Sequence, residues 1–369
     1  MNDHIYSLIQ LAADGQKLQA EDWETVLNIS DPEAQQFLYG KASDLRVQLC
    51  GANVALRGLV EVSNYCTKNC LYCGIRKDNC NVPRFELELN EIVDTAMLAQ
   101  EYRYGSVVLQ SGERTDVRFI DKIAEAVSRI KKYSNGKIGV TLSCGEQEKS
   151  VYQDWFSAGA HRYLLRIETS DRKLYSSLHP AGHSFDNRVQ CLHYLKECGY
   201  QLGTGIMCGL PRQTAADIVK DIDFFENIDA DMIGMGPYLV QHDTPLAALC
   251  PDFEQEKAAR LSFALNMIAV VRLRLRDVNI AATTALHALA PDGREQGLKA
   301  GANVVMPNLT PLRFRSGYLL YDDKPGVNEN AASSRNALRE SIEKAGFSVI
   351  DDDWGDSVHF LTKSKLPHA

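Results

Sequence analysis

Hydrophobic and polar residues follow two alternating patterns along most of the chain. Short runs rich in valine, isoleucine and leucine end in small or polar residues, and longer stretches follow in which apolar residues recur three and four positions apart. The short runs predict buried strands and the longer stretches predict amphipathic helices. Eight strands are expected, at residues 56–62, 106–110, 138–142, 162–166, 201–207, 232–235, 280–284 and 303–306.

The helical stretches lie between these strands. Examples are residues 89–102, 119–132, 188–197 and 215–227. Strands that alternate with helices predict a parallel sheet, and eight such units favour closure into an α/β fold of the (β/α)8 TIM-barrel type. An open, doubly wound sheet remains the alternative.

Both ends of the chain extend beyond the predicted barrel, which we place at residues 51–320. Residues 1–50 are expected to form a helical extension that packs against it, with a helix start at Ser30-Asp31-Pro32, where a capping side chain precedes proline. Residues 321–369 are expected to form a helix at 329–344, stopped by Gly346, and a tail to which the sequence assigns no chemistry.

Composition narrows the classes of function. The net charge of −8 argues against a nucleic-acid-binding face and favours a small-molecule substrate. The first residues have no basic segment followed by an apolar run, and the chain has no stretch of about 18 apolar residues. We therefore expect no membrane association and a cytoplasmic location, where scattered cysteines remain free thiols.

Three cysteines follow the first predicted strand. The stretch CTKNCLYC contains Cys66, Cys70 and Cys73, and random placement of ten cysteines in 369 residues gives this spacing only about 0.007 times per chain. The loops after barrel strands carry the chemistry, and thiolates suit iron–sulfur clusters and zinc. Zinc sites favour two separated pairs and electron-transfer 4Fe-4S sites use four cysteines. Three local cysteines favour a cluster with one open iron, with a structural zinc or redox site as the alternative.

Other strand ends carry polar motifs. Tyr72 precedes the last cysteine, the second strand ends in LQSGE with Glu113, the fourth ends in LLRIET with Arg166 and Glu168, and Arg188 follows in FDNR. Together with the cysteines, these motifs resemble the radical S-adenosylmethionine (SAM) superfamily. The resemblance implies one 4Fe-4S cluster whose open iron binds the amino and carboxylate groups of SAM. One electron from the reduced cluster then cleaves the sulfonium and leaves a 5′-deoxyadenosyl radical.

Longer segments narrow the resemblance. VTLSCGE, GIMCGLPRQT, IGMGPYLVQHDTPLA and GANVVMPNLTP are similar to the HydE family of iron-only (FeFe) hydrogenase maturases, over about residues 55–320. This implies that Glu113, Arg166, Glu168 and Arg188 contact SAM and that the cysteines Cys66, Cys70 and Cys73 bind the cluster. No further catalytic residue is assigned. The implied substrate cavity is lined by Arg57, Ser143, Met232, Thr283, Thr284, Tyr318 and Tyr321.

The same resemblance implies substrate and partners. The substrate would be a small cysteine-bound iron complex with carbonyl and cyanide ligands, and the partners would be reduced flavodoxin or ferredoxin and the other hydrogenase maturases. The basic residues Arg76 and Lys77, close to the cysteines, are suited to docking an acidic electron donor.

The sequence departs from the family pattern in two places. Some members have a second cysteine cluster near the C-terminus, but no cysteine follows Cys250, so one cluster is expected. Isoleucine stands at position 167, where certain members have histidine. The related alternatives are a biotin-synthase-like sulfur insertion, with Cys144 or Cys208 supporting an additional cluster, and a methylornithine-synthase-like lysine mutase. A non-catalytic iron–sulfur carrier is the alternative from a different class.

Overall fold

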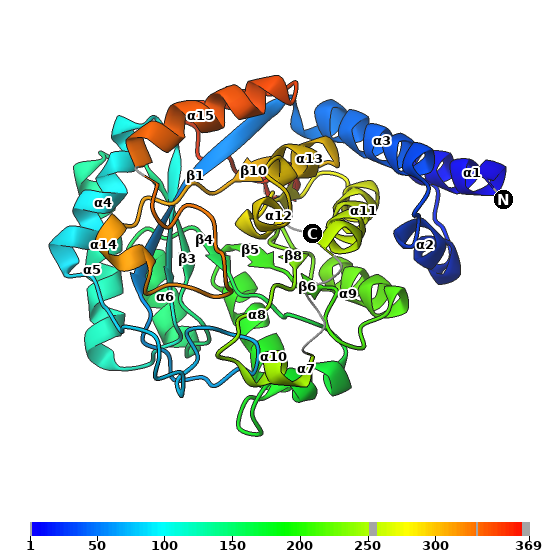
Figure 1. The fold of residues 1–369 in the computed structure, drawn as a ribbon. Helices are drawn as coiled ribbons and strands as arrows, with labels where there is room; N and C mark the ends of the chain where they lie inside the picture. The colour runs from blue at the N-terminus through cyan, green and yellow to red at the C-terminus, as the bar shows by residue number, and fades with distance from the viewer. Residues whose placement is uncertain (1, 251–256, 330, 364–369) are drawn as a thin grey trace.

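A closed barrel of parallel strands forms the centre of the molecule (Figure 1). The structure is a computed structural model that describes residues 2–250, 257–329 and 331–363. Around the barrel the strands follow the order β10, β1, β2, β3, β4, β5, β7, β9. A parallel bridge between Ala281 and Val304 joins the two ends of this order. The predicted TIM-type barrel is confirmed, with strands at β1 (Asn53–Ser63), β2 (Ser106–Ser111), β3 (Gly139–Ser143), β4 (Arg162–Leu164), β5 (Gln201–Thr204), β7 (Met232–Ile233), β9 (Asn279–Ile280) and β10 (Val304–Val305).

Two of the expected strands are interrupted. The run 201–207 divides into β5 and β6 (Met207–Cys208), and the run 232–235 ends early at β7, with β8 (Gly236–Pro237) following. The strands β6 and β8 pair with each other in a separate two-stranded sheet. A Cβ atom on Gly205 would lie 1.9 Å from the carbonyl oxygen of Gly234, so this close main-chain approach requires glycine.

The prediction of a strand at residues 280–284 is wrong for the second half of this segment. Strand β9 ends at Ile280, Thr283 is the N-cap residue of a helix, and Thr284 begins that helix, α12 (Thr284–Leu289). The β-branched run IAATT favours a strand locally, but threonine is also a preferred residue at helix starts. The barrel therefore turns into helix α12 earlier than the sequence pattern indicates.

Helices surround the barrel in the order that the periodicity predicts. Residues 89–102, 119–132, 188–197 and 215–227 all fall largely within observed helices. The apolar faces of these helices join the strands in one continuous core. The helices of this layer are α4 (Leu89–Glu101), α5 (Val117–Tyr133), α6 (Lys149–Ser157), α8 (Phe185–Glu197), α9 (Ala215–Asn227), α11 (Lys257–Leu275), α12, α13 (Gly293–Lys299) and α14 (Leu312–Arg315). Two short helices, α7 (Arg172–Leu178) and α10 (Pro245–Leu249), instead pack in a separate apolar cluster with Leu71 and Tyr72.

Three helices precede the barrel and lie to one side of it in Figure 1. They are α1 (Asn2–Ala13), α2 (Ala20–Leu27) and α3 (Pro32–Cys50). The predicted start of α3 is confirmed, because the Asp31 carboxylate accepts a hydrogen bond from the Ala34 N–H at 2.9 Å and proline occupies the first turn. The side-chain amide of Asn266 in α11 donates to the carbonyl oxygens of Leu27 and Ile29, both at 2.9 Å. These bonds attach the extension to the barrel.

The C-terminal segment closes the N-terminal end of the barrel. After α15 (Ala331–Lys344), an unpredicted strand, β11 (Ser348–Ile350), pairs in parallel with β1. The Asp356 carboxylate then forms an ion pair with the buried guanidinium of Arg162, and the Gly355 carbonyl accepts hydrogen bonds from Arg57 and Asn279, both at 2.8 Å. The tail that the sequence left without a role therefore covers the barrel floor before α16 (Val358–Lys363).

The contacts of the C-terminal segment with the barrel floor predict that the protein is less stable at acidic pH. Burial lowers the pKa of His161 to about 4, below the value of about 6.5 of an unfolded chain. The folded state holds His161 in its neutral form, so the stabilisation of the fold by this side chain is fully present above pH 6.5 and is lost as the pH falls through 4. We expect the free energy of unfolding in urea to be lower at pH 4.5 than at pH 7, and His161→Gln to remove about 2 kcal/mol of that difference. The exposed His193 provides the control, because His193→Gln should keep the wild-type pH dependence. An unchanged dependence in His161→Gln would contradict this account.

Candidate functional site

The three cysteines lie in one irregular loop at the C-terminal end of β1. Main-chain hydrogen bonds attach this loop to its surroundings at three points. The Thr67 N–H donates to the Glu113 carbonyl at 2.8 Å, Leu71 N–H to Leu178 at 2.9 Å, and Gly74 N–H to Leu320 at 3.1 Å. Glu113 follows β2, Leu178 is the last residue of α7, and Leu320 follows α14, so the loop is fixed from several sides of the barrel mouth before any metal binds.

The sulfur atoms are partly buried and differ in their partners. The Cys66 sulfur accepts hydrogen bonds from the main-chain N–H groups of Lys68 and Glu113, both at 3.4 Å. Burial raises the pKa of Cys70 to about 12 and raises the pKa values of Cys66 and Cys73 as well. All three are therefore thiols at neutral pH in the absence of a metal, and binding of a metal cluster has to displace their protons.

Two glycines allow the neighbouring loops to approach the cysteines. A Cβ atom on Gly112 would lie 2.3 Å from the Tyr65 carbonyl oxygen and 2.8 Å from the Cys66 Cβ. Gly145 has a φ of +78°, and its Cβ would lie 2.3 Å from the Glu113 side chain. A larger residue at position 112 would push the loop after β2 away from the cysteine loop, and one at position 145 would push the loop after β3 away from Glu113.

A buried network of charges lies beside the cysteine loop. The Lys68 ammonium lies 3.1 Å from the Glu113 carboxylate and 3.4 Å from the Glu146 carboxylate. The Arg188 guanidinium donates to Glu146 at 2.6 Å and lies 3.8 Å from Glu113. Burial alone would raise the pKa of Glu146, but the hydrogen bond from His183 and the charge of Arg188 hold it well below its usual range. Glu146 is therefore an anion inside the site.

The predicted pair after β4 also faces this region. The Arg166 guanidinium lies 3.0 Å from Oε2 of Glu168. Glu168 has a φ of +67°, a left-handed conformation that residues other than glycine adopt at a cost and that often marks functional sites. Burial raises the pKa of the Glu168 carboxyl, and its Oε2 accepts no well-aligned hydrogen bond from the described residues. The carboxyl group therefore has acceptor capacity left for a ligand.

Comparison with known proteins agrees with this geometry. The model of the radical SAM superfamily matches residues 60–225. The FeFe hydrogenase maturase subunit HydE of Thermotoga maritima is 42% identical over 330 residues, which cover 89% of this chain and 91% of that protein. The chain belongs to the HydE family of radical SAM enzymes. The predicted family is thereby confirmed.

Other proteins share the fold of this HydE-family chain. The 3-methylornithine synthase of Methanosarcina barkeri is 28% identical over 323 residues, which cover 87% of this chain and 88% of that protein. The solved structure of methylornithine synthase (PylB) superimposes with a TM-score of 0.77 at 24% identity, covering 94% of this chain and 98% of that chain. The structure of HydG, a maturase of the FeFe hydrogenase, gives a TM-score of 0.75 at 19% identity, covering 94% and 76%.

The residues present fit the cofactors that the family implies, a 4Fe-4S cluster and SAM. The cysteine loop offers three sulfur atoms in a fixed loop, with N–H donors already directed at the sulfur of Cys66. Such donors favour the thiolate that a cluster requires. The Oε2 atom of Glu168, which accepts no well-aligned hydrogen bond from the described residues, and the carboxylate of Glu113 are of the acceptor type that the polar groups of SAM would need. Among the described residues, no helix is long and apolar enough to pass through a membrane.

Arg188, a predicted SAM contact, has a protein partner at each of its three nitrogen atoms. Besides Glu146, it donates to the Arg166 carbonyl at 2.6 Å, and its second terminal nitrogen lies 2.9 Å from the His183 ring. These contacts fix the position of its guanidinium, and its contact with SAM stays a prediction.

The seven residues expected to line the substrate cavity fall into two groups. Arg57 and Met232 lie at the N-terminal end of the barrel, where the guanidinium is 2.9 Å from the Met232 sulfur and bonded to the C-terminal segment. The others lie toward the mouth, where Tyr318 accepts a hydrogen bond from the Gln110 amide at 3.2 Å. This second group comprises Ser143 at the end of β3, Thr283, Thr284, Tyr318 and Tyr321.

Sequence reasoning missed three members of the charged network. Lys68, Glu146 and His183 come from the loops after β1, β3 and α7, and only the folded chain brings them together. One signal was present, since Glu146 ends the SCGE motif after β3, which parallels the SGE motif with Glu113 after β2. The side chain of Ile167, by contrast, is fully buried in the main core rather than in the site.

Proposed function

We propose that this HydE-family enzyme uses one 4Fe-4S cluster, held by Cys66, Cys70 and Cys73, in the reductive cleavage of SAM during assembly of the FeFe-hydrogenase cofactor. Bound to the chain, the cluster supplies the electron that converts SAM into methionine and a 5′-deoxyadenosyl radical. The observation that carries the proposal is the buried network of Lys68, Glu113, Glu146 and Arg188 against the cysteine loop. A site that only stores a cluster has no need of such a network.

The protein groups would bind SAM through its polar ends. The Glu113 carboxylate is suited to accept hydrogen bonds from the SAM ammonium, and Arg166 can pair with the SAM carboxylate. The Glu168 carboxyl can accept from the ribose hydroxyls through its unaligned oxygen. Because these groups are largely buried, their interactions with SAM are only weakly screened by water.

A cavity lined by Thr284 carries more basic than acidic side chains. Its volume is about 420 Å³, and its charged lining residues are Arg294, Arg315, Lys324 and Arg335 on the basic side, with His287 beside them, and Glu295 and Glu329 on the acidic side. We infer that the substrate is a small cysteine-bound iron complex with anionic ligands and that the adenosyl radical attacks its sulfur. The excess of basic over acidic side chains in this cavity favours such an anion over an uncharged molecule.

A single cluster is supported by the placement of the other cysteines. Cys144 and Cys208 are buried in the main hydrophobic core, where the Cys144 sulfur donates to the Leu109 carbonyl at 3.7 Å. No cysteine follows Cys250 in the sequence. This argues against the biotin-synthase-like alternative, which needs sulfur ligands for an additional cluster inside the barrel.

The partners follow from the reaction. We infer a cytoplasmic location, transfer of the product to the other hydrogenase maturases, and reduced flavodoxin or ferredoxin as electron donor. The exposed Lys77, four residues beyond Cys73, is placed to meet such an acidic donor.

Glu168→Gln tests this proposal. The amide keeps the size of the side chain but loses the charge, so we expect about 100-fold slower activation of cluster-deficient FeFe hydrogenase in an extract that contains the other maturases. The measurement is hydrogen evolution after in vitro maturation. Glu101→Gln, at an exposed carboxylate at the end of α4, is the control and should match the wild type. Full activation by Glu168→Gln would support the iron–sulfur carrier instead.

A further inference from the structure

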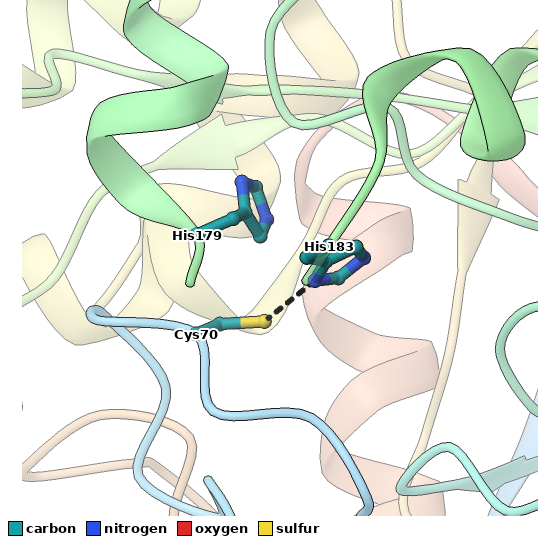
Figure 2. A group of neighbouring side chains, drawn as sticks. All are labelled: Cys70, His179 and His183. Atoms are coloured by element: carbon teal, nitrogen blue, oxygen red, sulfur yellow. Dashed lines mark hydrogen bonds between the residues drawn. The ribbon is translucent and has the colours of Figure 1, made fainter. Parts of the chain in front are cut away.

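A histidine that the reaction does not account for lies against one of the cysteines. His183, in the HPAGH loop between α7 and α8, places its Nδ1 atom 3.8 Å from the Cys70 sulfur (Figure 2). The ring is almost completely buried, with 6% of its surface exposed. A second histidine, His179, lies beside it, and one ring nitrogen of each histidine lies within 4.8 Å of the Cys70 sulfur.

The partners of His183 permit a proton on the Nδ1 atom that faces the sulfur. Its Nε2 atom is 2.9 Å from a terminal nitrogen of Arg188, which can only donate, so a ring that carries its proton on Nδ1 accepts at Nε2. The Glu146 carboxylate, 3.2 Å from the same Nε2 atom, favours the other arrangement, in which Nε2 donates to Glu146. A Cys70 thiolate can only accept, so ligation of a cluster favours the arrangement in which an N–H group on Nδ1 faces the sulfur.

The neighbouring His179 has the opposite arrangement. Its Nδ1 atom lies 2.8 Å from the Tyr175 carbonyl oxygen, which can only accept, so the proton of the neutral ring is used there. Its Nε2 atom then accepts from the Tyr72 hydroxyl at 3.2 Å. His179 therefore has no proton left for the sulfur and provides a matched control in the same place.

We propose that His183 is a positioning residue that donates an N–H···S hydrogen bond to the Cys70 thiolate of the bound cluster and thereby raises its reduction potential. A cysteine that ligates iron is a thiolate and can only accept hydrogen bonds. The bond stabilises the reduced cluster more than the oxidised one, because the reduced cluster carries one more negative charge on its iron and sulfur atoms. This inference rests on the proposed cluster site.

Redox titration of the reconstituted full chain without SAM tests the inference. We expect His183→Phe to lower the equilibrium constant for one-electron reduction about tenfold, which corresponds to ~59 mV. His179→Phe should keep the wild-type potential to within a third of that shift. The fraction of reduced cluster is measured by EPR at fixed pH. Equal potentials in His183→Phe and the wild type would overturn the inference.

A second measurement does not depend on the His183 variant folding. In wild-type protein with 15N-labelled histidine, pulsed EPR of the reduced cluster should show a histidine 15N coupling that persists in His179→Phe. If the cluster is intact and the coupling is absent, or disappears in His179→Phe, the inference is wrong while the proposed function stands. A wild-type chain that assembles no cluster would overturn both.

Discussion

Cys70→Ala is expected to leave a folded protein that holds no 4Fe-4S cluster and makes no 5′-deoxyadenosine above background, a loss of about 10³-fold or more. The loop offers three sulfur ligands, and two remaining thiolates cannot hold a cluster that already has one open iron. The fold should survive, because main-chain bonds of Thr67, Leu71 and Gly74 hold the loop without using the Cys70 sulfur. Iron and sulfide content, visible absorption and product formation are the measurements.

The control for this variant lies in the same loop. Cys80 is exposed, and its sulfur donates to the Asp78 carbonyl at 3.7 Å, so Cys80→Ala should keep the cluster and the activity. If Cys80→Ala lost the cluster, or if Cys70→Ala kept it, the assignment of the three ligands would be wrong.

Arg188→Ala has the second largest expected effect. The change leaves the buried carboxylates of Glu113 and Glu146 without their shared guanidinium, and removing one partner of a buried ion pair costs about 3–5 kcal/mol. We expect the free energy of unfolding in urea to fall by about that amount and SAM binding to be lost. Arg188→Lys keeps the charge but loses the planar guanidinium group. Its free energy of unfolding and its SAM affinity should lie between those of the wild type and Arg188→Ala.

Arg172, an arginine on the surface, provides the control for the loss of stability and SAM binding in Arg188→Ala. Arg172 pairs with Asp186 where both side chains are mostly exposed, and such pairs contribute about 0–1 kcal/mol. Arg172→Ala should therefore unfold almost like the wild type and bind SAM normally. If Arg188→Ala were no less stable than Arg172→Ala, the charged network would not have the structural role described above.

The predictions that succeeded rest on local patterns. The period of apolar residues predicts α4, α5, α8 and α9, because one face of each helix packs on the barrel. The start of α3 follows from the capping aspartate and the proline after it. The spacing of the three cysteines is also local, so the position of the candidate metal site could be predicted from the sequence alone.

The features that were predicted wrongly or not predicted at all depend on the folded chain rather than on local patterns. Thr283 and Thr284 have strand-forming side chains, and only the turn into α12 shows that they begin a helix. Strand β11 pairs with β1 across almost 300 positions, and the ion pair of Asp356 with Arg162 joins residues almost 200 positions apart, so no local pattern reports them. The same is true of His183, which contacts Cys70, Arg188 and Glu146 from separate segments of the chain.

The most direct test of the central claim is the formation of 5′-deoxyadenosine by the anaerobically reconstituted wild-type protein with SAM and a strong reductant. The account predicts that the product appears only when cluster, SAM and reductant are all present. A protein whose 4Fe-4S cluster is spectroscopically intact and reducible, but which forms no 5′-deoxyadenosine, would contradict the claim that this site carries out radical SAM chemistry.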